Sequence, residues 1–379
     1  MRKVPVSALQ PGLRLAKSVY GANNEVYLQT GAILTARYIQ KLKELGFSSV
    51  YVYDPVLQDV EIPEATDVIH EETRREAVGQ IRNLLLETAS SHAKAVLPPK
   101  ELSRTISDMV EQIIQNPSSR VINMADIRAR NEYLYHHSVN VCVLALTVGA
   151  EMGLSRRELF DLGTGAVLHD VGKIKIPVEI LEKPGRLTDE EFALVKRHTL
   201  IAEEMLSDNP VAAGIACMHH ERVNGEGYPR GLKGAQVSLL AQITGIADVF
   251  DALIADRCYR KAYAPHEALE MLLAAGDYWF DYEVVRRFVN VVAAYPVGTL
   301  VELNTKETGA VVGTPKGFPT QPVVRVFLDA EKGWLADPYD LSTLEKRRFV
   351  VRVLDEEEVA FIKARFTGQS ASRHRRDID

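Results

Sequence analysis

The first 56 residues alternate short apolar runs with turn signals such as Gln10-Pro11-Gly12. Between Thr35 and Leu45 the spacing of apolar residues becomes helical, and a β-like run follows from Ser49 to Tyr53. This mixture of short strands and one helix predicts a small β/α domain over residues 1–60.

The next segment, residues 61–104, carries more charge and then takes on a helical period. Its apolar residues recur at Val78, Ile81, Leu84, Leu85 and Ala89, and Pro98-Pro99 marks the stop. We therefore expect a helical connector, and no residue in this segment or before it points to chemistry.

Residues 105–299 have the pattern of almost continuous helix. Strand-like patterning returns after Pro296, in β-branched runs between Gly and Pro turns: Val297–Leu303, Gly309–Gly313, Pro322–Leu328 and Arg347–Leu354. The sequence thus predicts a multidomain, mainly α protein. An all-helical domain over 105–299 is flanked by the small mixed β/α N-terminal domain and by a small β-rich C-terminal unit over 300–366. We expect the polar tail, 367–379, to be disordered.

Composition narrows the class of protein. The length of 379 residues suits two or three domains, and 46% hydrophobic with 25% charged residues is typical of a globular chain. The net charge of −6 argues against a nucleic-acid polymer as partner, although a local basic pocket for one small anion stays open.

The apolar stretches are too short to predict a membrane partner. The longest, Val139–Ala150, spans about a dozen residues, whereas a bilayer needs about 20. The N-terminus lacks the apolar region of a secretion signal. Three widely spaced cysteines, Cys142, Cys217 and Cys258, form neither a disulfide framework nor a metal motif. We expect a cytoplasmic protein with buried free thiols.

Five histidines and two aspartates in the helical region carry the candidate chemistry: His137, His169, Asp170, His198, His219, His220 and Asp248. Neutral imidazole and carboxylate are ligands for Zn, Fe, Mn or Ni, and the lack of thiolates disfavours structural zinc. Seven candidates exceed the needs of one ion. We therefore expect two divalent ions per chain, with Fe or Mn favoured and Ni or Zn as alternatives.

The local pattern suggests how two ions could share ligands. A predicted helix from Arg156 to Leu168 delivers His169 and Asp170 at its end. Consecutive helical residues point about 100° apart, so His169 and Asp170 can bind the same ion only if that ion sits at a shallow angle across both side chains. Asp170 has two carboxylate oxygens and can instead bridge two ions. His219 and His220 can likewise supply neighbouring ions.

These residues lie in motifs that resemble a known family. His169-Asp170 resembles the signature of the HD metal-dependent phosphohydrolase superfamily. Residues 219–229, HHERVNGEGYP, resemble the HHExxxGxGYP motif of its HD-GYP family at every specified position. Further matches are His137-Ser138, Asp170-Val171-Gly172-Lys173, Lys183-Pro184-Gly185, His198-Thr199 and Asp248-Val249-Phe250-Asp251-Ala252. The resemblance covers about half the chain, from near residue 105 to near 299.

The resemblance implies a phosphoric diester hydrolase that converts cyclic di-GMP, a bacterial second messenger, to pGpG and in some members to GMP. It also implies the ligand sets, which are His137, His169, Asp170 and Asp248 for one ion, and Asp170, His198, His219 and His220 for the other. Some members hold a third ion with an acidic residue one helical turn before the first histidine. Tyr133 occupies that position here, so we expect two.

A pair of ions suits this reaction. Two ions about 3.5–4 Å apart lower the pKa of a bridging water and neutralise charge on the phosphate, so the bridging hydroxide can be the nucleophile. Asp170 and Lys173 are then the expected catalytic residues, with Lys173 at the scissile phosphate. Arg257 and Arg260 match basic residues that hold the phosphates in this family.

The Gly-rich loop within the second motif is expected to contact the base. By the resemblance, Tyr228 helps to shape a guanine pocket, and Gly227 allows close approach of a ligand. Glu221 and Asp251 are expected to be carboxylates that orient the imidazoles.

Two other functions stay open at this point. One is a phosphodiesterase for another cyclic dinucleotide, such as cyclic GMP–AMP, because nothing in the sequence separates guanine from adenine. The other is a non-catalytic module that binds cyclic dinucleotides, although no ligand is missing. Residues 1–56 and 297–355 are candidates for sensory parts or for the formation of a homodimer.

Overall fold

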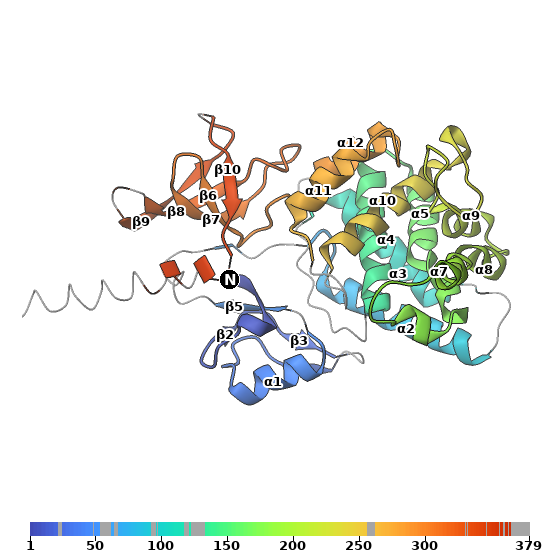
Figure 1. Ribbon diagram of the computed structural model, residues 1–379, viewed down its shortest axis with the longest axis horizontal. Helices are drawn as coiled ribbons and strands as arrows, with labels where there is room; N and C mark the ends of the chain where they lie inside the picture. The colour runs from blue at the N-terminus through green and yellow to red at the C-terminus, as the bar shows by residue number, and fades with distance from the viewer. Residues whose placement is uncertain are drawn as a thin grey trace, which may run out of the picture.

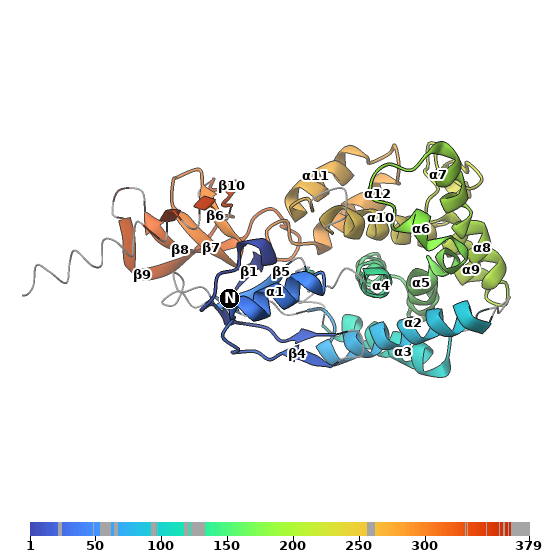
Figure 2. The ribbon, with the colours of Figure 1, turned by 60° about the horizontal axis from the view of Figure 1, so that its bottom comes forward.

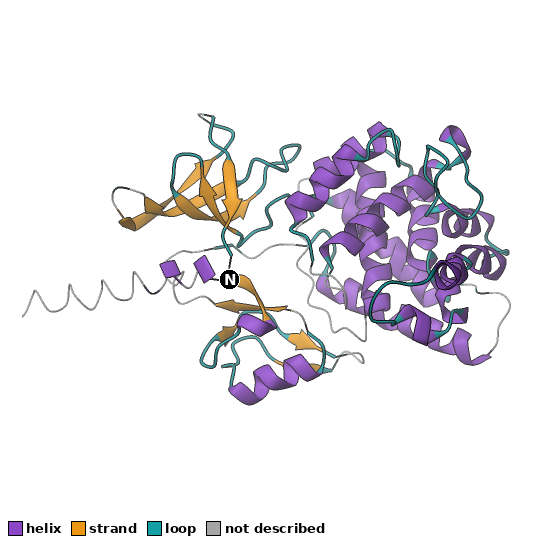
Figure 3. Cartoon of the chain, in the orientation of Figure 1, coloured by secondary structure: helices purple, strands orange, loops and turns teal. Residues whose placement is uncertain are grey.

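The computed structural model describes most of the chain (Figure 1). The described residues are 1–21, 25–47, 49–53, 62–63, 67–91, 96, 98–116, 121–122, 133–255, 262–329, 331, 333–345, 347–355, 357–358, 361–362 and 364. Figure 3 shows strands gathered in two regions beside one large helical region. The predicted tail, 367–379, lies outside the described residues.

The N-terminal region is a small β/α unit. Its three-stranded antiparallel sheet has the order β1-β5-β2, with β1 at Arg2–Pro5, β5 at Ser49–Tyr53 and β2 at Arg14–Leu15. A short hairpin pairs β3, Val19–Tyr20, with β4, Val26–Leu28. Helix α1, Ala36–Glu44, begins after Thr35, whose hydroxyl accepts a hydrogen bond from the Tyr38 amide.

The helical region contains the following elements: α2 Glu71–Ser91, α3 Lys100–Gln115, α4 Tyr133–Glu151, α5 Arg156–Leu168, η5 Val171–Lys175, α6 Val178–Leu181, α7 Asp189–Lys196, α8 His198–Met205, α9 Pro210–Met218, α10 Leu239–Ile254, α11 Pro265–Ala274 and α12 Tyr282–Val291. Helix α4 lies at the centre of this region (Figure 2) and packs against α2, α3, α5, α10 and α12. All its side chains from 139 to 148 are buried, as expected for a helix that is apolar on every side.

Helix α2 belongs to the same core as the helices that follow it. Ala77, Ile81, Leu84 and Leu85 are buried in one cluster with residues of α4, α5 and α10. The segment predicted as a connector therefore contributes directly to the helical domain. Its limits, 61–104, and the other domain boundaries stay predictions.

The C-terminal region is a five-stranded antiparallel sheet with the order β10-β6-β7-β8-β9. The strands are β6 Leu300–Leu303, β7 Thr308–Gly313, β8 Val323–Asp329, β9 Gly333–Ser342 and β10 Val350–Val353. Four of them match the predicted runs, whereas β9 was not predicted. Its sequence contains Asp337 and Pro338, which are rare in central strands, but β9 is an edge strand and its register with β8 shifts near this point.

Two further expectations can be compared with the structure. Cys142 and Cys217 are buried free thiols, as predicted, and Cys258 lies outside the described residues. Within the described ranges, no helix combines the length and apolar character needed to cross a bilayer.

Candidate metal centre

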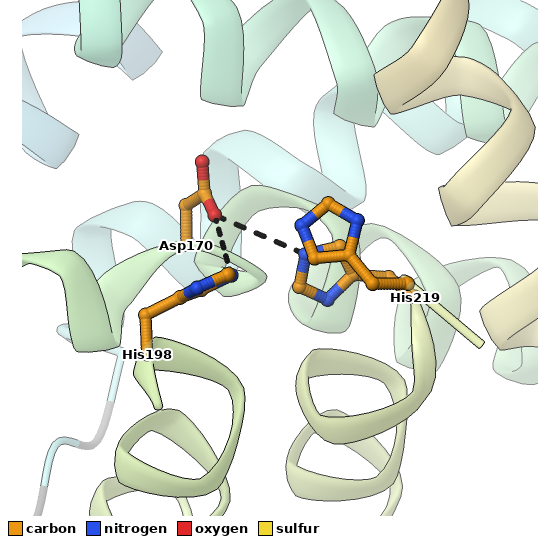
Figure 4. A group of neighbouring side chains, drawn as sticks. Asp170, His198 and His219 are labelled. Atoms are coloured by element: carbon orange, nitrogen blue, oxygen red, sulfur yellow. Dashed lines mark ion pairs between the residues drawn. The ribbon is translucent and has the colours of Figure 1, made fainter. Parts of the chain in front are cut away.

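The predicted ligands converge from the ends of several helices into the core of the helical region. His137 lies in the first turns of α4, His169 and Asp170 follow α5, His198 begins α8, His219 and His220 follow α9, and Asp248 lies within α10. Six of the seven are buried, and the His220 side chain is 17% exposed. Figure 4 shows His198 and His219 directed at Asp170.

These side chains form two groups with Asp170 between them. Asp170, His198, His219 and His220 make one group, and His137, His169 and Asp248 make the other, with the potential ligand atoms of each group within 4.8 Å of one another. Oδ1 of Asp170 lies 3.3 Å from Nε2 of His198 and 3.9 Å from that of His219. Oδ2 lies 3.4 Å from Nε2 of His169 and 3.7 Å from that of His137. Each oxygen of this carboxylate therefore faces a different group.

Asp248 also reaches both groups. Its Oδ1 lies 3.1 Å from Nε2 of His137, and its Oδ2 lies 3.7 Å from Nδ1 of His220. Asp170 and Asp248 therefore stand between the two sets of imidazoles, so either carboxylate could be shared by two cations.

Backbone contacts fix the ring orientation of three histidines. Nδ1 of His169, His198 and His219 lies 2.7, 2.7 and 2.8 Å from the carbonyl oxygens of Ala166, Val195 and Ala216, respectively. A carbonyl only accepts hydrogen bonds, so Nδ1 carries the proton and Nε2 presents a lone pair. This is the arrangement in which a histidine binds a metal.

Four inward-facing atoms have no hydrogen-bond partner in the described part of the chain. Nε2 of His169, His198 and His219 and Oδ1 of Asp170 are buried and make no hydrogen bond within the described residues. Burying such groups unpaired is unfavourable, and lone pairs that face one another add repulsion. Divalent cations would satisfy all of these atoms at once, so the donor set fits a metal centre.

Electrostatics keep the donors in the form that binds metal. Burial lowers the pKa of His198 to about 4 and that of His220 to about 3, so both imidazoles are neutral at pH 7. Burial alone would raise the pKa of Asp170, but the interactions that lower it, chiefly with the Lys173 ammonium, outweigh burial and hold that pKa well below its usual range. Neutral imidazoles around an ionised carboxylate are the species that coordinate cations.

Close packing between η5 and α8 brings Asp170 and His198 together. A Cβ atom added to Gly172 would lie 2.0 Å from the carbonyl oxygen of His198 and 2.8 Å from the amide nitrogen of Ala202. No side chain fits at this distance, so only glycine allows the two segments to approach so closely.

Lys173 stands at the edge of the cluster. Its ammonium forms an ion pair with Oδ2 of Asp170, and its side chain is 24% exposed. A cation that touches the central carboxylate and still reaches solvent can also meet an anionic ligand that enters from outside.

Glu221 contacts the backbone of the loop that follows the histidine pair. Its buried carboxylate accepts hydrogen bonds from the backbone amides of Arg230, at 2.7 Å, and Leu232, at 3.0 Å. It therefore holds this loop, and among the described residues these two amides are the hydrogen-bond partners seen for its oxygens. The backbone is crowded there, since a Cβ atom on Gly227 would lie 2.3 Å from the Arg222 amide nitrogen.

Asp251 contacts a histidine, as predicted. Its Oδ2 lies 2.8 Å from Nδ1 of His137, and its Oδ1 accepts a hydrogen bond of 3.0 Å from the side-chain amide of Asn140. All three side chains are buried. Sequence reasoning did not single out Asn140, although its spacing of three residues from His137 places both on one helix face.

An aromatic rim lies beside the histidine pair. The ring centroid of Tyr228 is 4.7 Å from that of His220 and 6.2 Å from that of Phe192. The ammonium of Lys196 lies 5.1 Å from the Phe192 centroid and 5.9 Å from the Tyr228 centroid. Phe192 and Lys196 were not predicted, although their spacing of four residues on one helix was a usable signal.

Two predicted phosphate contacts, Arg257 and Arg260, lie outside the described residues. The structure therefore brings the seven predicted ligands, Lys173, Tyr228 and Asp251 together around one centre, whereas Glu221 and Gly227 lie in the loop that follows the histidine pair.

Comparisons with known proteins identify the class and then the family. A family model described as an HD domain matches residues 103–284, and one described as a KOW domain associated with HD domain matches residues 300–362. Cyclic di-GMP phosphodiesterase PA4108 of Pseudomonas aeruginosa is 30% identical over 366 residues, which cover 87% of this chain and 86% of that protein. The chain therefore belongs to the HD-GYP family of the HD phosphohydrolases.

Two further relatives match shorter parts of the chain. Cyclic di-GMP phosphodiesterase response regulator RpfG of Xanthomonas campestris is 45% identical over 139 residues, or 35% of this chain and 37% of that protein. The 3'3'-cGAMP-specific phosphodiesterase 3 of Vibrio cholerae is 33% identical over 179 residues, or 46% of this chain and 38% of that protein. Relatives with two different substrate names thus match this chain.

We expect Gly172→Ala to disrupt the centre, because its Cβ would push α8, and His198 with it, away from Asp170. Elemental analysis of the anaerobically purified protein should show loss of at least one ion per chain, together with a lower melting temperature. Gly79→Ala is the matched control, since Gly79 lies in α2 with no atom within 4 Å of its added Cβ. Its effect should be neutral or stabilising by up to about 1 kcal/mol. Wild-type metal content and stability in Gly172→Ala would contradict the packing argument.

Proposed function

We propose that this protein is a metal-dependent cyclic di-GMP phosphodiesterase that hydrolyses the cyclic dinucleotide to pGpG or GMP. The observation that carries the proposal is the buried Asp170 carboxylate, whose two oxygens face two separate groups of imidazoles. The match over most of the chain to a protein named as a cyclic di-GMP phosphodiesterase supports it.

The proposed metal content is two divalent ions per chain, with Fe or Mn favoured over Ni or Zn. The ligands would be His137, His169, Asp170 and Asp248 for one ion, and Asp170, His198, His219 and His220 for the other. A site of imidazoles and carboxylates without thiolates suits these metals. When bound, such ions neutralise phosphodiester charge and lower the pKa of water.

The chain's own residues would hold the substrate beside the ions. Lys173, already paired with Asp170, offers a partly exposed ammonium to a phosphate oxygen and would stabilise charge that builds up in the transition state. Burial, together with the Asp248 carboxylate, raises the pKa of Tyr228, so its phenol stays protonated and can donate a hydrogen bond. Arg257 and Arg260 are proposed phosphate contacts from the sequence motif alone.

The aromatic rim would bind a nucleobase. Phe192 is 45% exposed, and it stands edge-on to Tyr228 at the open side of the centre. Purines stack on aromatic side chains whatever their edge groups are. A rim of this kind accepts guanine and adenine alike, so the proposal keeps 3'3'-cGAMP as a second candidate substrate, which the match to the Vibrio cholerae protein favours.

We predict two ions per chain in protein purified anaerobically. His198→Ala should lower the count by one because it removes a donor from one group, and His137→Ala should do so by depleting the other group. His266→Ala is the control. His266 lies in α11, its ring centroid is 5.2 Å from that of Tyr295, and it takes part in neither group. Elemental analysis measures the count, and a wild-type value of one or three would contradict the assignment.

We predict that protein loaded with Mn or Fe under reducing conditions converts cyclic di-GMP to pGpG or GMP, as measured by chromatography of the products. Asp170→Asn should lower turnover at least about 1,000-fold, because the amide cannot serve both groups as a negatively charged bridge. Asp161→Asn, also on α5 but outside both groups, should keep wild-type turnover. Fully metallated wild-type protein that leaves cyclic di-GMP intact would refute the proposal, and faster turnover of 3'3'-cGAMP would favour the second substrate.

We predict that Phe192→Ala raises KM for cyclic di-GMP by roughly fivefold or more, because stacking contributes about 1–3 kcal/mol per base. The value of kcat should stay within about twofold, since Phe192 belongs to neither metal group. Phe318→Ala, which removes a similarly exposed ring (49%) from the C-terminal region, should change neither constant. Steady-state kinetics provide the measurement, and an unchanged KM would remove Phe192 from the binding site.

A further inference from the structure

A chain of polar side chains leads from His137 away from the metal centre to helix α2. Nδ1 of His137 meets Oδ2 of Asp251 at 2.8 Å, and Oδ1 of Asp251 accepts from the amide of Asn140 at 3.0 Å. Oδ1 of Asn140 in turn accepts from Nη1 of Arg74 at 2.7 Å. Nε of Arg74 donates to Oδ2 of Asp67 at 2.6 Å. The chain thus joins a proposed metal ligand to residues well before the HD motifs.

Each link in this chain has a defined direction. Asp251 is fully buried, and its two oxygens lie at hydrogen-bond distance from Nδ1 of His137 and from the Asn140 amide, so this carboxylate is placed to accept a hydrogen bond from Nδ1 of His137. Nε2 of His137 then presents its lone pair to the centre, where it lies 3.1 Å from Oδ1 of Asp248. The protonation pattern that prepares His137 for a cation therefore depends on Asp251 and on what holds Asp251.

Arg74 decides which way the Asn140 amide points. An asparagine side chain can present either its NH₂ group or its oxygen to Asp251, and an oxygen facing a buried carboxylate would be repulsive. Arginine only donates hydrogen bonds, so it must meet the amide oxygen and leaves the NH₂ group to face Asp251. Asn140 is 1% exposed, so no solvent could replace the guanidinium in this role.

The surroundings hold Arg74 itself in place. The Asp67 carboxylate contacts its Nε, and this carboxylate also accepts from the Val68 amide at 2.7 Å. The Arg74 side chain is only 14% exposed. The N-terminus of α2 is joined to α3, because Gln112 accepts from the His70 amide at 2.7 Å and donates to the Thr73 hydroxyl at 2.9 Å. These contacts fix the position of the Arg74 guanidinium, so it can orient the Asn140 side chain.

We infer that Arg74 is a positioning residue for the metal centre, which acts through Asn140 and Asp251 on His137. The segment before the HD domain match, 103–284, thereby takes part in metal binding. The inference rests on the metal centre of the proposed function and names no further ligand.

The test is a calorimetric titration of metal-free protein with Mn(II) under reducing conditions. Removal of outer partners of metal-bound histidines typically costs 10–100-fold in metal affinity, so Arg74→Ala should weaken binding at one of the two sites roughly tenfold. Arg75→Ala is the matched control, since the neighbouring guanidinium lies 4.9 Å from the Tyr20 ring and, among the described residues, forms no hydrogen bond with Asn140 or Asp251. Equal Mn(II) affinities in the two variants would overturn the inference.

A double-mutant cycle separates the polar chain from general loosening of α2. Asn140→Ala should weaken Mn(II) binding as Arg74→Ala does, and the double variant should lose no more than the single ones because both act on the same link. Losses that simply add would overturn the inference. If Arg74→Ala does not fold, Arg74→Lys serves instead, because a single ammonium lacks the two separate nitrogens with which the guanidinium contacts Asp67 and Asn140. Wild-type Mn(II) affinity in Arg74→Lys would count against the positioning role of Arg74.

The outcome is independent of the substrate. The titration contains no cyclic dinucleotide, so protein that binds Mn(II) and responds to Arg74→Ala but hydrolyses nothing would refute the proposed function alone. Protein that hydrolyses cyclic di-GMP yet binds Mn(II) equally well with and without Arg74 would refute this inference alone.

Discussion

The helical region surrounds one unfavourable arrangement, in which metal-binding atoms that have no hydrogen-bond partner among the described residues face one another inside the core. Nε2 atoms of His169, His198 and His219 surround the Asp170 carboxylate without a hydrogen-bond partner among the described residues. Elsewhere the core is filled by aliphatic and aromatic side chains. Their burial is favourable and offsets the free-energy cost of burying the unpaired polar atoms. The helices around α4 can be understood as a scaffold that holds these atoms together.

Much of the site could be predicted because its residues are set by local patterns. The helix from Arg156 to Leu168 ends where the sequence indicated, and the predicted ligands gather around its last turn. Motif spacing fixes how far apart two ligands can lie along the chain. It does not give distances across the fold, and the division of the two Asp170 oxygens between the groups became visible only in the structure.

The features that escaped prediction arise from long-range contacts. The loop after the histidine pair folds back so that the amides of Arg230 and Leu232 meet the Glu221 carboxylate, a contact that the motif alone does not predict. Arg74 and Asn140 are 66 positions apart, and no period in either segment links them. Strand β9 was missed because its composition disfavours a strand, whereas pairing along one side of β8 tolerates a proline at the sheet edge.

The three histidines whose Nδ1 atoms meet backbone carbonyls also finish helices. Ala166, Val195 and Ala216 lie in the last turns of α5, α7 and α9, where carbonyl groups lack partners within the helix. Each imidazole ring satisfies one of these carbonyls with one nitrogen and faces the centre with the other. If a homologue lost metal binding during evolution, these histidines could still not be replaced freely, because three helix ends would lose the hydrogen bonds to their last carbonyl groups. Replacements that still donate a hydrogen bond to the same carbonyl would be the ones that survive.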